Sequence, residues 1–255
     1  MKHYKVYLLL ILFSSFFLEG FCWEQEGHRI TGNIAQKYVT QRTLDSLQAY
    51  LGATSLADAA AWMEDIRADT SYNYLRPFHY INIEKGESYN PSSQGNIISE
   101  LNKVIAELKN RGNYPKAQIA LDLKILCNLV GDLHNPLHVG YQVDRGGNSV
   151  FVSFLGRQSN LHRVWSADII KQYSMAAMDC QFVLDGKSDD ELKKLAKTDI
   201  IGWLNESRAS LPVVYDFKNP EIDAAYCRKN RPLIEKELAL AGLRLAALLN
   251  GLFAN

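Results

Sequence analysis

Residues 115–138 read PKAQIALDLKILCNLVGDLHNPLH, and this stretch decides the fold. Its opening proline suits the first turn of a helix. Apolar residues then recur at helical spacing at Leu121, Ile125 and Leu129. We expect one long helix that ends near Pro136, with an acidic and histidine-rich segment where it ends.

The same spacing recurs along most of the chain. Further helices are expected at 30–38, 43–51, 55–66, 97–108, 160–173, 189–210 and 232–252. Thr43 and Ser55 are the expected N-caps of two of them, and Pro232 is expected to open the last. No repeat, low-complexity segment or linker interrupts the pattern. The sequence therefore predicts an all-α fold, a single mainly helical domain over residues 23–255.

One segment, 139–155, has a different character. Arg145-Gly146-Gly147-Asn148 is typical of a turn, and Val150-Phe151-Val152 has β propensity. A small β-hairpin is expected there.

Residues 1–22 have the pattern of a secretory signal peptide. Lys2 and Lys5 precede an apolar run over 6–18, which is too short for a comfortable membrane span. An uncleaved anchor and a lipid-modified Cys22 are the alternatives. Cleavage after Cys22 would free the amine of Trp23. From the signal-peptide pattern we expect a secreted or periplasmic protein without stable membrane association.

Charge gives little general attraction for nucleic acid. The whole chain has 28 basic and 28 acidic residues, and loss of 1–22 removes two basic and one acidic residue, which leaves a net charge near −1. Non-specific binding of a polyanion needs a basic surface. Any phosphate chemistry must therefore depend on a local site, for which metal ions are the natural choice.

Three cysteines follow the signal segment: Cys127, Cys180 and Cys227. A Cys180–Cys227 bridge is possible in an oxidising compartment. Cys127 stands in an apolar helical run and is expected to be a small core residue.

Five histidines remain after residue 22, and three neighbourhoods carry chemistry. In the first, Trp23 precedes His28, and a free α-amine with a pKa of about 7.7–8.0 is an accessible metal ligand. In the second, Asp132 is followed by His134 and His138, and its carboxylate is well placed to bridge two cations. In the third, His162 stands four residues before Ser166, on the same helical face.

Each of these neighbourhoods also has a purely structural interpretation. His28 taken alone is a surface residue near a terminus. Asp132 is a buried, hydrogen-bonded residue at a helix end, although the two nearby histidines favour metal binding. His162 is a core histidine satisfied by the Ser166 hydroxyl. Two further segments offer donors, Glu64 with Asp65 on a helix, and His79 beside Tyr80 in an extended segment.

Taken in order, these segments resemble one known family. The shared motifs are Trp-x-x-x-Gly-His at 23–28, Ala-x-Trp-x-acid-x-x-Arg, Pro-x-His-Tyr-Ile, Gly-Asp-x-His-x-Pro-Leu-His, Arg-Gly-Gly-Asn and Asn-Leu-His-x-Val-Trp. The set is similar to the S1/P1 nuclease family of zinc-dependent single-strand nucleases and 3′-nucleotidases, and it spans essentially all of 23–250. The resemblance implies the mainly helical fold that these enzymes share with zinc phospholipase C.

The resemblance also implies up to three zinc ions. One would be held by Trp23, His28 and Asp132. A second would share Asp132 and use the positions of Glu64, His79 and Asn128. The third would use the positions held here by His138, His162 and Ser166.

Three of those positions depart from the family pattern, which has Asp, His and Asp where this chain has Glu64, Asn128 and Ser166. Glu64 keeps the charge on a longer arm. Asn128 is a poor, neutral zinc ligand. Ser166 leaves its site with two strong ligands, His138 and His162, which we expect to bind zinc weakly.

The resemblance implies a hydrolase of single-stranded DNA, RNA or nucleotides, with Asp132 at its catalytic centre. Tyr80 is a candidate base-stacking surface and Asn82 a candidate hydrogen-bond partner for a base edge; ordinary packing is the alternative for both. The altered ligands suggest a second hypothesis, a catalytically impaired protein that binds nucleotides or a partner. A zinc phospholipase C is a third.

Overall fold

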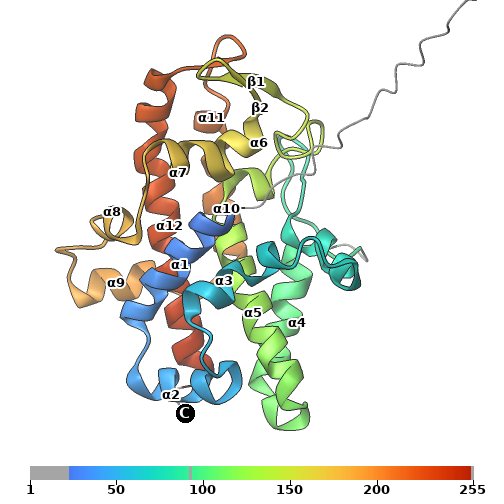
Figure 1. Ribbon diagram of the computed structural model, residues 1–255, viewed down its shortest axis with the longest axis vertical. Helices are drawn as coiled ribbons and strands as arrows, with labels where there is room; N and C mark the ends of the chain where they lie inside the picture. The colour runs from blue at the N-terminus through green and yellow to red at the C-terminus, as the bar shows by residue number, and fades with distance from the viewer. Residues whose placement is uncertain (1–22, 92–93, 254–255) are drawn as a thin grey trace, which may run out of the picture.

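The computed structural model describes residues 23–91 and 94–253, and it is mainly helical (Figure 1). The predicted signal peptide, residues 1–22, lies outside the described residues. The α-helices are α1 (Gln25–Tyr38), α2 (Gln41–Leu51), α3 (Leu56–Asp65), α4 (Ile97–Lys109), α5 (Lys116–Leu133), α6 (Leu161–Arg163), α7 (Ile169–Gln172), α8 (Ala177–Gln181), α9 (Asp189–Leu195), α10 (Ile200–Ala209), α11 (Leu211–Val214) and α12 (Ala224–Phe253). The prediction of an all-α fold is confirmed.

Shorter elements complete the chain. The 3-10 helices are η1 (Thr70–His79), η2 (Arg111–Asn113) and η3 (Pro136–Val139), and η4 (Val164–Asp168) is a π-helical turn. The strands are β1 (Phe151–Phe154), β2 (Arg157–Asn160) and β3 (Glu221–Ile222). No helix within 23–91 and 94–253 is both long enough and apolar enough to pass through a membrane.

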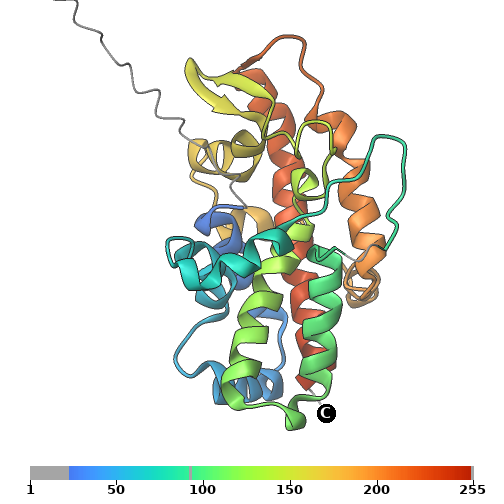
Figure 2. The same cartoon turned by 90° about the vertical axis from the view of Figure 1, so that its right-hand side faces the viewer.

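The long helix α12 runs the length of the molecule, and α1 packs across it (Figure 1). α1 also contacts α3, α3 contacts α5, and α5 contacts α4. Figure 2 shows the α4–α5 pair at one end of the molecule and the β-hairpin at the other.

The core consists of two apolar clusters. One is formed by α2 to α5 with the end of α12, and it includes Leu133. The other is formed by α1, β1, the 161–184 segment and the first two-thirds of α12, and it includes Leu137. The short segment from Asp132 to His138 therefore lies where the two clusters meet, and both hold it in place.

The N-caps of α3 and α2 compare differently with the predicted ones. The Ser55 hydroxyl accepts a hydrogen bond from the Asp58 amide, so Ser55 is the N-cap of α3 as predicted. The prediction of Thr43 as a cap was wrong, because α2 begins earlier. There Thr40 is the cap, and its hydroxyl accepts from the Thr43 amide at 3.2 Å.

The β-hairpin lies later than predicted. Its turn is Leu155-Gly156, where both residues have positive φ, and β1 pairs antiparallel with β2 from Phe151↔Asn160 to Phe154↔Arg157. The 145–148 segment forms a separate tight loop. β3 pairs parallel with β1 and was not predicted, since two residues are too few to give a periodic signal.

Two long predicted helices are interrupted, and the last one begins early. Segment 160–173 contains the π-turn η4, and segment 189–210 is divided where Asp199 caps α10 through the Gly202 amide. The prediction that Pro232 opens the last helix was wrong. Asp223 accepts from the Tyr226 amide and begins α12 there, while Pro232 lies inside the helix.

All three cysteines after residue 22 are free and buried. The Cys180–Cys227 bridge is therefore not formed. Cys127 is a core residue, as predicted.

Two glycines allow the central helices to approach closely. A Cβ on Gly32 of α1 would lie 2.4 Å from the Leu56 carbonyl oxygen of α3. A Cβ on Gly242 of α12 would lie 2.5 Å from the Ile34 Cβ of α1. α1 carries His28, so these contacts also fix one side of the candidate site.

The substitution Gly32→Ala should lower the free energy of unfolding by about 1–3 kcal/mol, because the new methyl group meets backbone that cannot rotate away. Thermal denaturation of both chains measures the difference. Gly251→Ala is the matched control, since a Cβ there meets nothing within 4 Å. That change should raise stability by up to about 1 kcal/mol. Equal melting temperatures for Gly32→Ala and the unmodified chain would contradict the packing described.

Candidate functional site

Asp132 is the centre of the candidate site. It is the penultimate residue of α5, and its side chain is fully buried. Its Oδ2 lies 2.7 Å from His79 Nδ1, and its Oδ1 lies 3.3 Å from His138 Nδ1 and 3.4 Å from His28 Nε2. The structure thus gathers three of the predicted histidines, from α1, η1 and η3, around one carboxylate.

Backbone pairing places two of these histidines. The Ile81 amide donates to the His138 carbonyl at 2.8 Å, and the Ile83 amide donates to the Gly140 carbonyl at 3.0 Å. The segment after η1 therefore runs alongside η3. In the same region His138 Nδ1 lies 2.7 Å from the His79 carbonyl oxygen.

That contact fixes the tautomer of His138. A carbonyl oxygen can only accept, so Nδ1 of His138 carries the proton and Nε2 is left with a lone pair. Nε2 is buried and has no hydrogen-bond partner. His162 is held in the same manner, with Nδ1 at 2.8 Å from the Gly146 carbonyl oxygen. The two rings lie 5.0 Å apart between centroids.

Burial and charge act against each other at this centre. Burial raises the pKa of Asp132, but the nearby imidazoles of His138 and His28 and the hydrogen bond with His79 lower it by more, so the pKa lies well below its ordinary value. Burial lowers the pKa of His79, but its contacts with Asp132 raise it above the ordinary 6.5. Burial lowers the pKa of His138 to about 3.

Several buried polar atoms around Asp132 have no hydrogen-bond partner. They are His28 Nδ1 and Nε2, Asp132 Oδ1, His138 Nε2 and Glu64 Oε1. A buried polar atom without a partner costs free energy, and native proteins seldom keep such atoms without a role. Imidazole nitrogens and carboxylate oxygens are zinc donors, so the chemistry of this set fits a zinc ion.

The donors do not converge on a single point. As the side chains stand, no set of three or more His, Cys, Asp and Glu residues within 23–91 and 94–253 is arranged to hold a metal ion. The argument for zinc at Asp132 therefore depends on which donors are present and on their burial.

The altered positions have different surroundings. Asn128 Nδ2 donates to the Ala60 carbonyl at 2.8 Å, and the Ser166 hydroxyl donates to the His162 carbonyl at 2.8 Å. Both side chains thus turn toward backbone. Ser166 does not fit the role of a third ligand beside His138 and His162. Glu64 keeps one carboxylate oxygen on Arg67, at 2.9 Å, and the other without a partner.

Trp23 lies beside the same helix end. Its side chain is fully buried, and its indole N–H donates to the Gly131 carbonyl at 2.9 Å. The next amide, that of Glu24, donates to the Ser166 carbonyl at 3.1 Å. These two bonds hold residues 23 and 24 against α5 and η4, and the Gly131 carbonyl lies one residue before Asp132.

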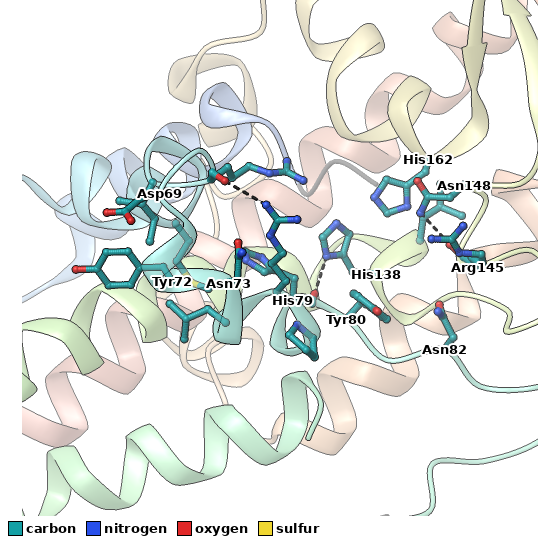
Figure 3. Close-up of a pocket in the computed structure, with 17 residues that line it drawn as sticks. Asp69, Tyr72, Asn73, His79, Tyr80, Asn82, His138, Arg145, Asn148 and His162 are labelled. Carbon is teal, nitrogen blue, oxygen red and sulfur yellow. Dashed lines mark hydrogen bonds between the residues drawn. The ribbon is translucent and has the colours of Figure 1, made fainter. Parts of the chain in front are cut away.

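A cavity of about 290 Å³ opens above this centre (Figure 3). Among the predicted residues, it is lined by His79, His138 and His162, and by the two candidate substrate-binding residues Tyr80 and Asn82. Tyr80 is 46% exposed, so its ring is available to a ligand.

Other lining residues were not predicted as site residues. They include Arg67, Tyr72, Asn73, Arg76, Arg145 and Asn148. Residues of η1 reach the cavity because the chain folds back against α4 and α5, which a periodic pattern does not reveal. Arg145 and Asn148 belong to the Arg-Gly-Gly-Asn motif, which was the available signal.

Comparison with known proteins gives a consistent result. The family model described as S1/P1 Nuclease matches residues 23–254. Endonuclease 4 of Arabidopsis thaliana is 25% identical over 92% of this chain and 90% of its own length. Nuclease S1 of Aspergillus oryzae is 26% identical over 89% of this chain and 91% of its own. Nuclease P1 of Penicillium citrinum is 25% identical over 75% of each.

The contact between His79 and Asp132 predicts a specific titration in the metal-free chain. His79 has a folded-state pKa above 6.5. Its contribution to stability is therefore complete below pH 6.5 and is lost as the pH rises through the folded-state value. Asp132→Asn should lower the pKa of His79, because the hydrogen bond and the charge of Asp132 then no longer oppose burial. NMR titration of the imidazole C–H resonances measures this.

His134 provides the internal control in the same spectra. Burial, together with the charge of Arg244, lowers its pKa to about 3, so it should stay neutral from pH 5 to 9 in both chains. An unchanged pKa of His79 in Asp132→Asn would show that the carboxylate does not control the site.

Proposed function

Because the chain belongs to the S1/P1 nuclease family, we propose that it hydrolyses phosphodiester bonds in single-stranded DNA or RNA with the help of zinc, and acts on 3′-nucleotides at the same site. The observation that carries the proposal is the set of unpartnered buried donors around Asp132, directly beneath a cavity with an exposed aromatic ring. We also propose that residues 23–255 form one exported domain after loss of residues 1–22.

The donors suggest where zinc would be held. Trp23, His28 and Asp132 would form one site, with the Trp23 amine available only after cleavage. His79 and Glu64 would share Asp132 in a second site. Zinc at these positions would supply Lewis acidity, which lowers the pKa of water and offsets negative charge on phosphate.

The protein's own residues would bind and orient the substrate. Asp132 has its direction fixed by His79 and by its place in α5, so its carboxylate cannot turn away. Tyr80 offers a stacking surface to a base, for which stacking contributes about 1–3 kcal/mol. Asn82 offers both a donor and an acceptor to a base edge. Arg67 lines the cavity and is held there by Glu64, at 2.9 Å.

A second candidate function has an observation of its own. Asn128 and Ser166 both donate to backbone carbonyls where the family pattern has zinc ligands. A chain with fewer zinc ions would bind nucleotides or a partner without cleaving efficiently. The phospholipase alternative has no comparable observation, and the relatives described above bear the names of nucleases.

The proposal is tested by incubating the mature chain, beginning at Trp23, with single-stranded DNA. Cleavage should stop on chelation, return with zinc, and fall at least about 100-fold in Asp132→Ala, because the shared donor is lost. Persistent cleavage in Asp132→Ala points to a contaminating nuclease. Binding without zinc-dependent cleavage by the unmodified chain would favour the second candidate.

The altered position Ser166 allows a test by gain of function. Ser166→Asp supplies an anionic oxygen near His138 and His162, so zinc content measured by native mass spectrometry should rise by about one ion per chain. Ser166→Ala is the control, since it removes the bond to the His162 carbonyl but adds no donor. If both variants bind as much zinc as the unmodified chain, the third site is not limited by residue 166.

A further inference from the structure

The loop that carries the Arg-Gly-Gly-Asn motif has an unusual backbone. Arg145, Gly146 and Gly147 all have positive φ, at 56°, 62° and 79°. Glycine adopts this left-handed conformation freely, whereas a residue with a Cβ does so at a cost in free energy. A strained non-glycine residue at the edge of a cavity is a reason to look for a role of its side chain.

Hydrogen bonds hold the 144–147 loop in this conformation, so the backbone strain at Arg145 is retained. Asp144 accepts from the Gly147 amide at 3.0 Å through one carboxylate oxygen and from the Tyr215 hydroxyl at 2.7 Å through the other. The Gly146 amide donates to the Tyr141 carbonyl at 2.9 Å. These bonds fix the direction in which residue 145 leaves the backbone.

The loop also packs closely against the candidate site. A Cβ on Gly146 would lie 2.2 Å from the Leu137 carbonyl oxygen, and one on Gly147 would lie 3.2 Å from the His162 amide nitrogen. The position of Arg145 is thereby tied to the backbone that carries His138 and His162.

The side chain of Arg145 is exposed and lines the cavity. Figure 3 shows it beside Asn148, at the end of the cavity opposite Tyr72, with His138 lying between the two ends. It forms no ion pair with a carboxylate in the part of the chain that the structure describes. Arg67, by comparison, is bound to Glu64.

We propose that Arg145 binds a phosphate of a single-stranded nucleic acid next to the phosphate that is cleaved, so that the cavity favours a polynucleotide over a mononucleotide. The inference rests on the proposed function, which puts the cleaved phosphate at Asp132. A guanidinium offers several donors in a plane that matches phosphate oxygens. Since the net charge of the chain is near zero, a fixed local cation is needed to hold a second phosphate.

Arg145→Gly is the decisive variant. It removes the guanidinium and at the same time relieves the left-handed backbone, so the chain should melt at the same temperature or higher. We would measure binding of the zinc-loaded mature chain to a phosphorothioate-linked thymidine octamer, which resists cleavage and keeps its charges. The dependence of log K on log salt should become shallower by about 0.7, the value of one phosphate contact on a single strand.

Two variants provide the controls. Ser174→Gly relieves a similar backbone strain, at φ 47°, but removes no charge, so its salt dependence should equal that of the unmodified chain. Arg145→Lys keeps the cation and should recover most of the slope.

The outcomes separate this inference from the proposed function. An unchanged slope in Arg145→Gly, or no binding of the octamer by the unmodified chain, overturns the inference even if DNA is cleaved. Binding of 3′-thymidine monophosphate has no adjacent phosphate to lose, so it should not change; an equal loss there would place Arg145 at the cleaved phosphate and also overturn it. A shallower slope confined to the octamer supports the inference, whether or not hydrolysis is seen.

Discussion

A fully buried carboxylate in contact with three imidazoles is the interaction on which the rest of the site depends. Asp132 cannot be hydrated, so its charge must be balanced by neighbours. Among its neighbours, His79 lies nearest, at 2.7 Å. His28 Nε2 and His138 Nδ1 lie farther off, at 3.4 Å and 3.3 Å. Both ring nitrogens of His28, and Nε2 of His138, have no hydrogen-bond partner. A cation brought to this carboxylate would satisfy atoms that the protein alone leaves unsatisfied.

The packing of the surrounding helices fixes the position of the Asp132 carboxylate. Asp132 lies in the last turn of α5, at the boundary of the two apolar clusters. The glycines at 32 and 242 let α1 approach α3 and α12 closely. The Trp23 indole donates to the Gly131 carbonyl, so Trp23 lies at the same helix end. The cavity above is then completed by loops, whose rigidity comes from hydrogen bonds such as those of Asp144.

Much of the fold could be predicted because helical spacing and caps are local signals, as at Ser55 and along α5. The hairpin was predicted too early in the chain because Gly146 and Gly147 are typical of a hairpin turn. In the structure they belong to a separate tight loop that packs against Leu137. The early start of α12 depends on the Asp223 cap, which outweighs the usual preference of Pro232 for a first turn. At the site, residue motifs indicated His28, His79, Asp132, His138 and His162. They could not show that Asn128 and Ser166 turn to backbone carbonyls, or that η1 covers the cavity, because both depend on tertiary contacts.

The central claim is that Asp132 and its histidines form a metal centre. The most direct measurement is anomalous diffraction at the zinc edge from crystals of the mature chain grown with zinc. The account predicts a strong peak within bonding distance of Asp132 and His28, next to Trp23, and a weaker peak or none between His138 and His162 because Ser166 supplies no third strong ligand. The absence of any peak beside Asp132, in crystals that hold zinc elsewhere, would contradict it.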